Sequence, residues 1–233
     1  MRISGAFAAF RLANRSKALI LTYHRFSRRE SDFATSARAF AEQLDYLRSR
    51  YRIVPLSELA DRLAADERLP GALAAITIDD GYSDAYEIAF PLLRRYGAPA
   101  TLFIVTGFVD RKAWLWTDKL RFITSRTNQK RIEIDLCDRP LHIELNGEAS
   151  RLRAADRINS ALKTMPEEER EEAIARIARS LSVVLPRTPP PEFAPVSWEQ
   201  VREMDACRVE IGSHTETHPI LTRVSRSRLR REL

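Results

Sequence analysis

The segment AAITIDDGY, from Ala74 to Tyr82, decides how this sequence folds. Its first part, Ala74–Ile78, is a short apolar run with β-branched residues, which is typical of a strand buried in a parallel sheet. Two acidic residues, Asp79 and Asp80, come directly after the run, and Gly81 then suits a tight turn. The segment therefore predicts a buried strand that ends in an acidic turn.

Similar runs flank this segment on both sides and alternate with helical patterns. This alternation is typical of repeated βα units on a parallel sheet, so the fold class is expected to be α/β. The other expected strands are Ala18–Tyr23, Arg52–Val54, Thr101–Val105 and Arg208–Ile211.

Helices are expected between the strands. Apolar residues recur at helical spacing in Ser36–Arg48, and Ser83–Tyr96 follows the acidic turn. Ser57 is expected to open another helix as its N-cap. Ser197 is followed by Gln200 at the spacing of a capping box, which predicts one more short helix.

Residues 114–194 interrupt the alternation and are expected to form an insertion. The chain is then expected to have three parts: the first part of the parent fold in residues 1–113, the insertion, and the continuation of the parent fold in residues 195–233. This organisation follows from the change of pattern alone.

A β-hairpin and a helix are expected within the insertion. Arg131–Leu136 and Leu141–Leu145 alternate in period two around Cys137–Asp138–Arg139–Pro140, which predicts the hairpin. The helix is expected to start at Thr164, with Pro166 in its first turn.

The composition, with 44% hydrophobic and 30% charged residues among 233, is that of an ordinary soluble globular protein. No apolar run approaches the ~18 residues that span a bilayer, and no segment has the long apolar core of a secretory signal. We therefore expect a cytoplasmic protein with no transmembrane segment. The oligomeric state stays open.

Basic residues gather at the two ends of the chain, since every charged residue among the first 29 is Arg or Lys. A weak contact of the N-terminus with a membrane surface is one interpretation, and solvated flanks are the other. No nucleic-acid partner is expected, because the basic ends match no recognised binding motif.

Two histidines follow the last expected strand at a spacing of four. His214 and His218 lie in GSHTETHP, and imidazoles at this spacing can bind one divalent metal ion. Surface or hydrogen-bonded histidines are the alternative for such a pair. The position of the two histidines after a strand favours a functional role, because a parallel α/β barrel has its active site at the C-terminal ends of its strands.

The adjacent carboxylates of Asp79 and Asp80 would repel one another unless a positive charge lies between them. One can bind a metal ion while its neighbour acts as general base, or both can serve the following helix as cap and turn residues. Together, Asp80, His214 and His218 make a three-ligand set with open positions, which is typical of a catalytic zinc site. Co, Ni or Mn would also suit these ligands.

Three strings resemble the polysaccharide deacetylases, the NodB-homology family or carbohydrate esterase family four. They are TIDDGY (77–82), APATLFIVTGF (98–108) and EIGSHTETHPIL (210–221). The resemblance implies a distorted (β/α) barrel of about seven strands. It also implies a general base at Asp79 and metal ligands at Asp80, His214 and His218.

The sequence departs from the family pattern at two places. Ile78 stands where the first motif usually has an aromatic residue. The family has further strands and another motif after the histidine pair of its second motif, whereas only Thr222–Leu233 follows that motif here. The barrel is therefore expected to be incomplete at its C-terminus, with five strands.

His24 ends the string LTYH, residues 21–24. In family members with a permuted motif order, a similar N-terminal strand ends in the acid histidine, which implies a catalytic role for His24. The alternative is a histidine that only orders the pocket. Tyr82 is expected either to line a substrate groove or to pack in the barrel.

Three further residues belong to the expected insertion. His142 is expected to be an exposed strand residue without a role, and Trp114 and Trp116 either form a sugar-stacking wall or anchor the insertion.

The resemblance implies a metal-dependent hydrolase that removes acetyl groups from an acylated polysaccharide or glycan. The alternative is a truncated, catalytically impaired fragment that at most binds glycan. The glycan and the choice between N- and O-deacetylation stay open.

Overall fold

The computed structural model describes residues 17–66, 69, 71–136 and 139–233. The predicted membrane contact of the N-terminus and the hairpin turn at Cys137–Asp138 fall wholly or mainly outside these residues. Two compact units are present: a first unit of Met1–Ile104 and Pro195–His214, and a second unit of Val105–Ala194 and Thr215–Leu233. Within the described ranges, no helix combines the length and apolarity that a membrane span requires.

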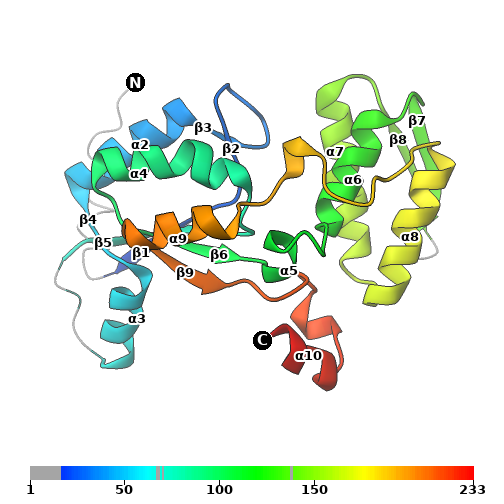
Figure 1. The fold of residues 1–233 in the computed structure, drawn as a ribbon. Helices are drawn as coiled ribbons and strands as arrows, with labels where there is room; N and C mark the ends of the chain where they lie inside the picture. The colour runs from blue at the N-terminus through cyan, green and yellow to red at the C-terminus, as the bar shows by residue number, and fades with distance from the viewer. Residues whose placement is uncertain (1–16, 67–68, 70, 137–138) are drawn as a thin grey trace. The chain divides into compact units, whose positions relative to one another are not determined.

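A five-stranded sheet forms the centre of the first unit, with the order β1-β5-β6-β9 and β4 joined to β5 (Figure 1). All of its strand pairs are parallel. The strands agree with the expected ones to within two residues at each end. They are β1 (Ala18–Tyr23), β4 (Arg52–Ile53), β5 (Leu73–Ile78), β6 (Ala100–Ile104) and β9 (Val209–Ser213).

All six residues of β5 are buried, which explains why five of them are apolar; the exception, Thr77, donates its hydroxyl to Oγ1 of Thr22 at 3.0 Å. Leu73 pairs with Ala18 of β1 and with Arg52 of β4, so β5 has a neighbour on each side. Near its end, Ile78 pairs with β1 and with Leu102 of β6. Because its residues are buried as well as paired on both edges, β5 has no solvent face that would favour polar residues.

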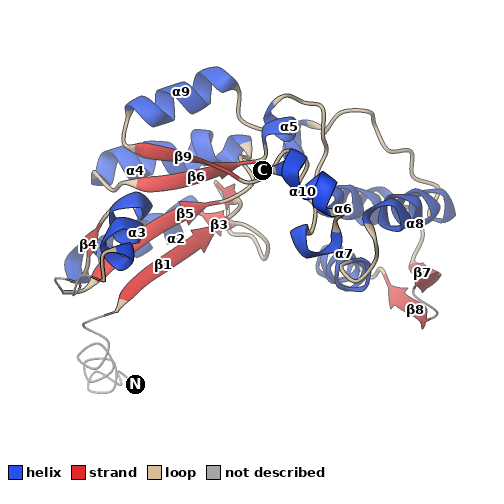
Figure 2. Ribbon diagram, turned by 90° about the horizontal axis from the view of Figure 1, so that it is seen from below, coloured by secondary structure: helices blue, strands red, loops and turns tan. Residues whose placement is uncertain are grey.

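Helices cover both faces of this sheet. Figures 1 and 2 show α2 and α4 on one face and α3 on the other. Ser36 caps α2, and Ser197 with Gln200 forms the predicted capping box at α9. The elements are the two-residue strands β2 (Phe26–Ser27) and β3 (Thr35–Ser36), the π-helix η1 (Ala85–Ala89), and the helices α2 (Ala37–Arg50), α3 (Leu56–Ala64), α4 (Phe90–Tyr96) and α9 (Trp198–Ala206).

The prediction that Ser57 caps a helix was wrong. The helix α3 begins at Leu56 and has Pro55 at its N-cap, so Ser57 lies in the first turn. Its hydroxyl donates to the carboxylate of Glu210 in β9. The serine serves a tertiary contact, which no local spacing reveals.

The second unit contains the predicted hairpin, in which β7 and β8 pair in antiparallel register. Its core joins the hairpin to three helices through buried residues such as Leu120, Ile132, Ile158 and Ile177. The elements are α5 (Thr106–Val109), α6 (Trp116–Arg126), β7 (Arg131–Leu136), β8 (Arg139–Glu144), α7 (Glu148–Leu162), α8 (Glu167–Ser180), the 3-10 helices η2 (Pro191–Phe193) and η3 (Leu221–Arg223), and α10 (Arg226–Glu232).

Two tryptophans of the second unit contribute to packing. Trp116 belongs to the buried core, and the ring of Trp114 lies 5.6 Å from Phe122 and 6.4 Å from Phe193 between ring centroids. These contacts favour the anchoring interpretation. His142 is exposed on β8, as expected.

Two helices of the second unit differ from expectation. The helix α8 begins at Glu167 with Pro166 as its N-cap, so the predicted start at Thr164 was wrong. A proline disfavours helical backbone at the residue before it, which keeps Met165 outside the helix. The helix α7 was not predicted, because Ala154 and Ala155 supply half of its fully buried face.

Candidate active site

The register of β1 and β5 brings His24 and Asp79 together. Tyr23 pairs with Ile78 at the ends of these strands, so the next residue of each strand lies at the same edge of the sheet. The backbone N–H of Asp79 continues this pairing by donating to the carbonyl of Tyr23 at 2.8 Å. As a result, Nε2 of His24 lies 3.8 Å from Oδ2 of Asp79.

The register of β6 and β9 places His214 in the same way. Ile104 pairs with Ser213, and the N–H of His214 donates to the carbonyl of Ile104 at 2.8 Å. The imidazole Nε2 of His214 lies 3.5 Å from Oδ1 of Asp80. The second of the two adjacent carboxylates therefore meets a histidine from a strand more than a hundred residues later.

A tight turn after β5 gives the adjacent carboxylates different neighbours. Asp80 and Gly81 have φ angles of 75° and 83°, in the left-handed region. A Cβ at Gly81 would lie 3.0 Å from Cγ2 of Ile104, so the turn needs glycine for both conformation and space. Through this turn, Asp79 meets His24 while Asp80 meets His214.

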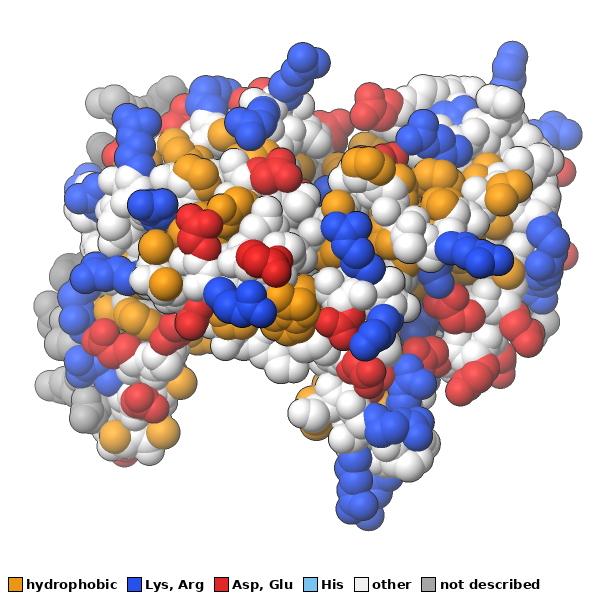
Figure 3. All heavy atoms as spheres, viewed as in Figure 1, with side chains coloured by type: hydrophobic (Ala, Val, Ile, Leu, Met, Phe, Trp, Pro, Cys, Tyr) orange, Lys and Arg blue, Asp and Glu red, His pale blue; other side chains and the backbone are white. Residues whose placement is uncertain are grey.

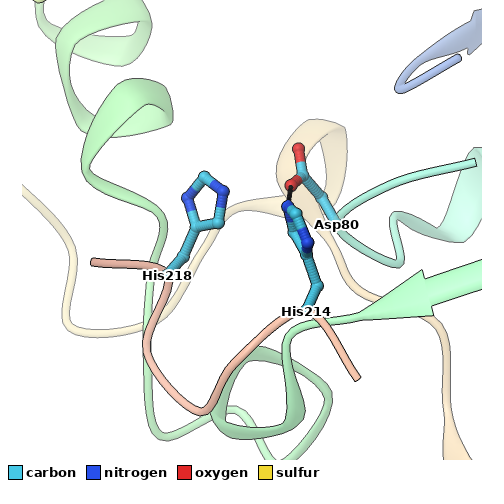
Figure 4. A group of neighbouring side chains, drawn as sticks. All are labelled: Asp80, His214 and His218. Atoms are coloured by element: carbon cyan, nitrogen blue, oxygen red, sulfur yellow. Dashed lines mark ion pairs between the residues drawn. The ribbon is translucent and has the colours of Figure 1, made fainter. Parts of the chain in front are cut away.

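His218 lies four residues after His214 and completes a group of three side chains (Figure 4). Asp80, His214 and His218 each offer one ligand atom, and these atoms lie within 4.8 Å of one another. One carboxylate oxygen and two imidazole nitrogens are a donor set that zinc and similar divalent ions accept. The residues present therefore fit a divalent metal ion.

The Asp79 carboxyl group is in a partly desolvated environment, with 18% of its side chain exposed. Burial raises its pKa above the ordinary value, and the nearby Asp80 carboxylate acts in the same direction. The imidazoles of His214 and His24 oppose this rise in pKa. A carboxylate with a raised pKa is a stronger proton acceptor, which suits a general base.

An ion pair that the sequence did not predict holds the strand-end loops of the first unit. Nε of Arg25 lies 2.7 Å from Oδ2 of Asp84, and both side chains are 12% exposed. The other oxygen of Asp84 accepts the backbone N–H of Phe26 at 3.0 Å. The pair thus links the loop that follows His24 to the turn that follows Asp79.

Tyr82 packs beneath this pair. It is 2% exposed, and the Arg25 guanidinium lies 4.1 Å from the centre of its ring. These contacts favour packing over the predicted wall of a substrate groove. The only sequence signals for the pair were the positions of Arg25 beside His24 and of Asp84 close to the acidic turn.

A parallel α/β sheet with carboxylates and imidazoles gathered at the C-terminal ends of its strands is the arrangement of α/β-barrel enzymes. The family model for polysaccharide deacetylases matches residues 66–233. The chain belongs to the polysaccharide deacetylase family, as the sequence motifs predicted. This membership makes it a relative of carbohydrate-deacetylating hydrolases.

Individual relatives support the same family and fold. YxkH of Bacillus subtilis is 29% identical over 133 residues, which cover 57% of this chain and 46% of that protein. The matched chain thus spans about half of this relative. The structure of the Streptococcus pyogenes deacetylase PplD in complex with acetate aligns with a TM-score of 0.54 at 17% identity, covering 94% of this chain and 65% of the other. This likeness shows a shared α/β fold of the deacetylase barrel type.

Proposed function

We propose that this chain is a metal-dependent hydrolase that removes acetyl groups from an acylated polysaccharide or glycan. The observation that carries the proposal is the group of Asp80, His214 and His218 beside the pair of His24 and Asp79. Membership of the deacetylase family supports the same reaction class.

In this proposal, Asp80, His214 and His218 hold a divalent metal ion. Zinc suits the one-oxygen, two-nitrogen set best, and Co, Ni and Mn are the other candidates. When bound, such an ion supplies the Lewis acidity that polarises an acyl carbonyl and acidifies water. The proton transfers of the reaction would then be carried out by residues next to these three side chains.

Asp79 would act as general base and accept a proton from the attacking water. Its partly desolvated carboxylate and its raised pKa favour this role. His24 would donate a proton to the departing amine or alcohol. Its side chain is 55% exposed, so it can meet a polymer that binds at the surface.

The test is acetate release from acetylated oligosaccharides by the purified chain, with and without chelator and added Zn²⁺. Chelation is expected to abolish release and Zn²⁺ to restore it. Asp79→Asn is expected to retain metal and lose about 10²–10⁴-fold in rate, as for removal of a general base. His214→Ala is expected to lose the metal.

Asp135→Asn and His142→Ala are matched controls, because both residues are exposed on the hairpin. Equal acetate release by all variants, or release that resists chelation, would contradict the proposal. Binding of the oligosaccharide without any release would instead support the alternative of a glycan-binding chain.

A further inference from the structure

A buried carboxylate in the C-terminal helix holds the loop that carries His218. Glu232 of α10 is 3% exposed. Its Oε2 accepts the backbone N–H groups of Glu216 at 3.1 Å and Thr217 at 2.8 Å. Its Oε1 accepts the Thr217 hydroxyl at 2.7 Å. One side chain thus binds three donors of two consecutive residues that lie between His214 and His218.

Arg228 provides the charge that compensates this carboxylate. Its Nε donates to Oε1 of Glu232 at 2.8 Å, and its Nη2 donates to the Thr217 hydroxyl at 3.0 Å. Nη2 also reaches Glu167 of α8 at 3.3 Å. Hydrogen bonds that involve ionised groups are stronger than neutral ones, so the loop is held firmly on this side.

The loop between the two histidines has a backbone that needs such support. Thr215 and His218 have φ angles of 74° and 60°, which non-glycine residues rarely adopt. The two strained residues enclose Glu216 and Thr217, the two residues whose N–H groups bind Glu232. Release of that carboxylate would leave the strained conformation with fewer contacts to hold it.

The opposite side of the loop is held by α5. The N–H of Thr106 donates to the carbonyl of Thr215 at 3.1 Å, and the N–H of Gly107 donates to the carbonyl of Glu216 at 2.9 Å. A Cβ at Gly107 would lie 2.6 Å from that carbonyl oxygen, so only glycine permits the approach. The loop is therefore fixed between α5 and the Glu232 carboxylate.

The charge state of Glu232 agrees with this arrangement. Burial alone would raise its pKa, but the hydrogen bonds from Thr217 and Arg228 outweigh burial and hold the pKa below its usual value. The carboxylate is surrounded in sequence by arginines, and Figure 3 shows basic side chains gathered on α10. The Glu232 side chain is thus an ionised carboxylate, a strong hydrogen-bond acceptor, within a helix that is otherwise basic.

We propose that Glu232 is a positioning residue for the metal site: it fixes the backbone of Glu216 and Thr217 and thereby the direction of the His218 imidazole. The inference rests on the proposed function, because it treats His218 as a ligand. Glu232 acts through the loop and does not itself touch the substrate or the metal ion.

The test compares Glu232→Ala and the milder Glu232→Gln with a control in the same helix. Ser225→Ala removes the N-cap of α10, whose hydroxyl accepts the N–H of Arg228 at 3.2 Å, without touching the loop. The first readout is amide hydrogen exchange in the metal-free protein. Protection of the Glu216 and Thr217 amides is expected to fall in the Glu232 variants and to persist in Ser225→Ala.

The second readout is Co²⁺ affinity, measured by titration of the visible spectrum. Loss of a residue that orients a metal ligand typically weakens metal affinity by about 10- to 100-fold, which is expected for Glu232→Ala. Glu232→Gln keeps one oxygen for the two backbone N–H groups, so a smaller loss is expected. Ser225→Ala is expected to bind Co²⁺ as the unchanged protein does.

The outcomes separate this inference from the proposed function. If the unchanged protein does not bind Co²⁺, both are overturned. If it binds Co²⁺ and both Glu232 variants bind equally well, only the positioning role is overturned. Equal losses in Ser225→Ala and Glu232→Ala, or unchanged protection of the two amides, would also overturn it.

Discussion

Asp84→Ala should destabilise the first unit strongly, because it removes the carboxylate that pairs with the Arg25 guanidinium. The two side chains are 12% exposed, and the atoms Nε and Oδ2 lie 2.7 Å apart. Removing one member of a buried ion pair costs about 3–5 kcal/mol. The remaining exposure favours the lower end of this range. The Phe26 N–H also loses its acceptor, which adds about 1 kcal/mol.

The measurement is thermal unfolding of the purified chain at neutral pH. A loss of about 4 kcal/mol corresponds to a fall in melting temperature of ~8–16 °C for a chain of this size. The control is Arg38→Ala, which removes an exposed pair with Glu30 at a similar distance of 2.8 Å. Exposed pairs contribute little, so the control should leave the melting temperature almost unchanged.

A second variant separates charge burial from loss of packing. Arg25→Met combined with Asp84→Ala removes both charges of the pair, so it should be no less stable than Asp84→Ala alone. Equal effects of Asp84→Ala and Arg38→Ala would refute the reasoning. A double variant far less stable than the single one would show that Arg25 stabilises through its contact with Tyr82 instead.

Two further predictions concern the sheet ends. Burial raises the pKa of Asp79 in the folded chain, so the ionised carboxylate destabilises the metal-free fold at pH 7. This destabilisation disappears as the pH falls through the raised pKa toward the ordinary value of 3.8. Asp79→Asn should therefore raise the melting temperature of the metal-free chain at pH 7, with a gain that shrinks in acid; a gain independent of pH would argue against this cause. Gly212→Ala should lower stability by about 1–3 kcal/mol, since its Cβ would lie 2.5 Å from Cδ1 of Phe103, and an unchanged melting temperature would show that the ring yields freely.

The central strands β5 and β6 could be predicted from the sequence because their burial leaves a local trace. β5 is buried along its whole length, so five of its six residues are apolar, and the acidic turn marks its end. The caps at Ser36 and Ser197 also depend on residues only three positions away. Such signals are short enough to be read without knowledge of the tertiary fold.

Ser57 and Thr164 show where local signals mislead. Both are residue types that often precede helices. In the structure, a proline takes the N-cap position in each case, at Pro55 and at Pro166. Ser57 instead donates to Glu210, which lies 153 residues later. The boundary of each helix was therefore set by proline geometry rather than by a capping hydroxyl.

The candidate metal ligands and general base could be proposed from the sequence, whereas the residues that hold them in place could not. Asp79 and Asp80 come directly after β5 and His214 directly after β9, so parallel register brings them to one edge of the sheet. His218 comes later, in the loop that follows His214. This placement needs no knowledge of individual tertiary partners.

Asp84 and Glu232 have no such signal, because the role of a carboxylate depends on which donors surround it. Asp84 binds an arginine 59 residues away, and Glu232 binds the backbone of a loop 15 residues before it. In the sequence, each is one acid among many, and each lies in or next to a helix where acids are common. Loss of either would disturb the candidate site without removing any residue of its motifs. A variant at either residue could therefore lower activity as a motif variant does. The Asp84 variant would be distinguished by its lower stability, and the Glu232 variant by a metal affinity that is weakened rather than lost.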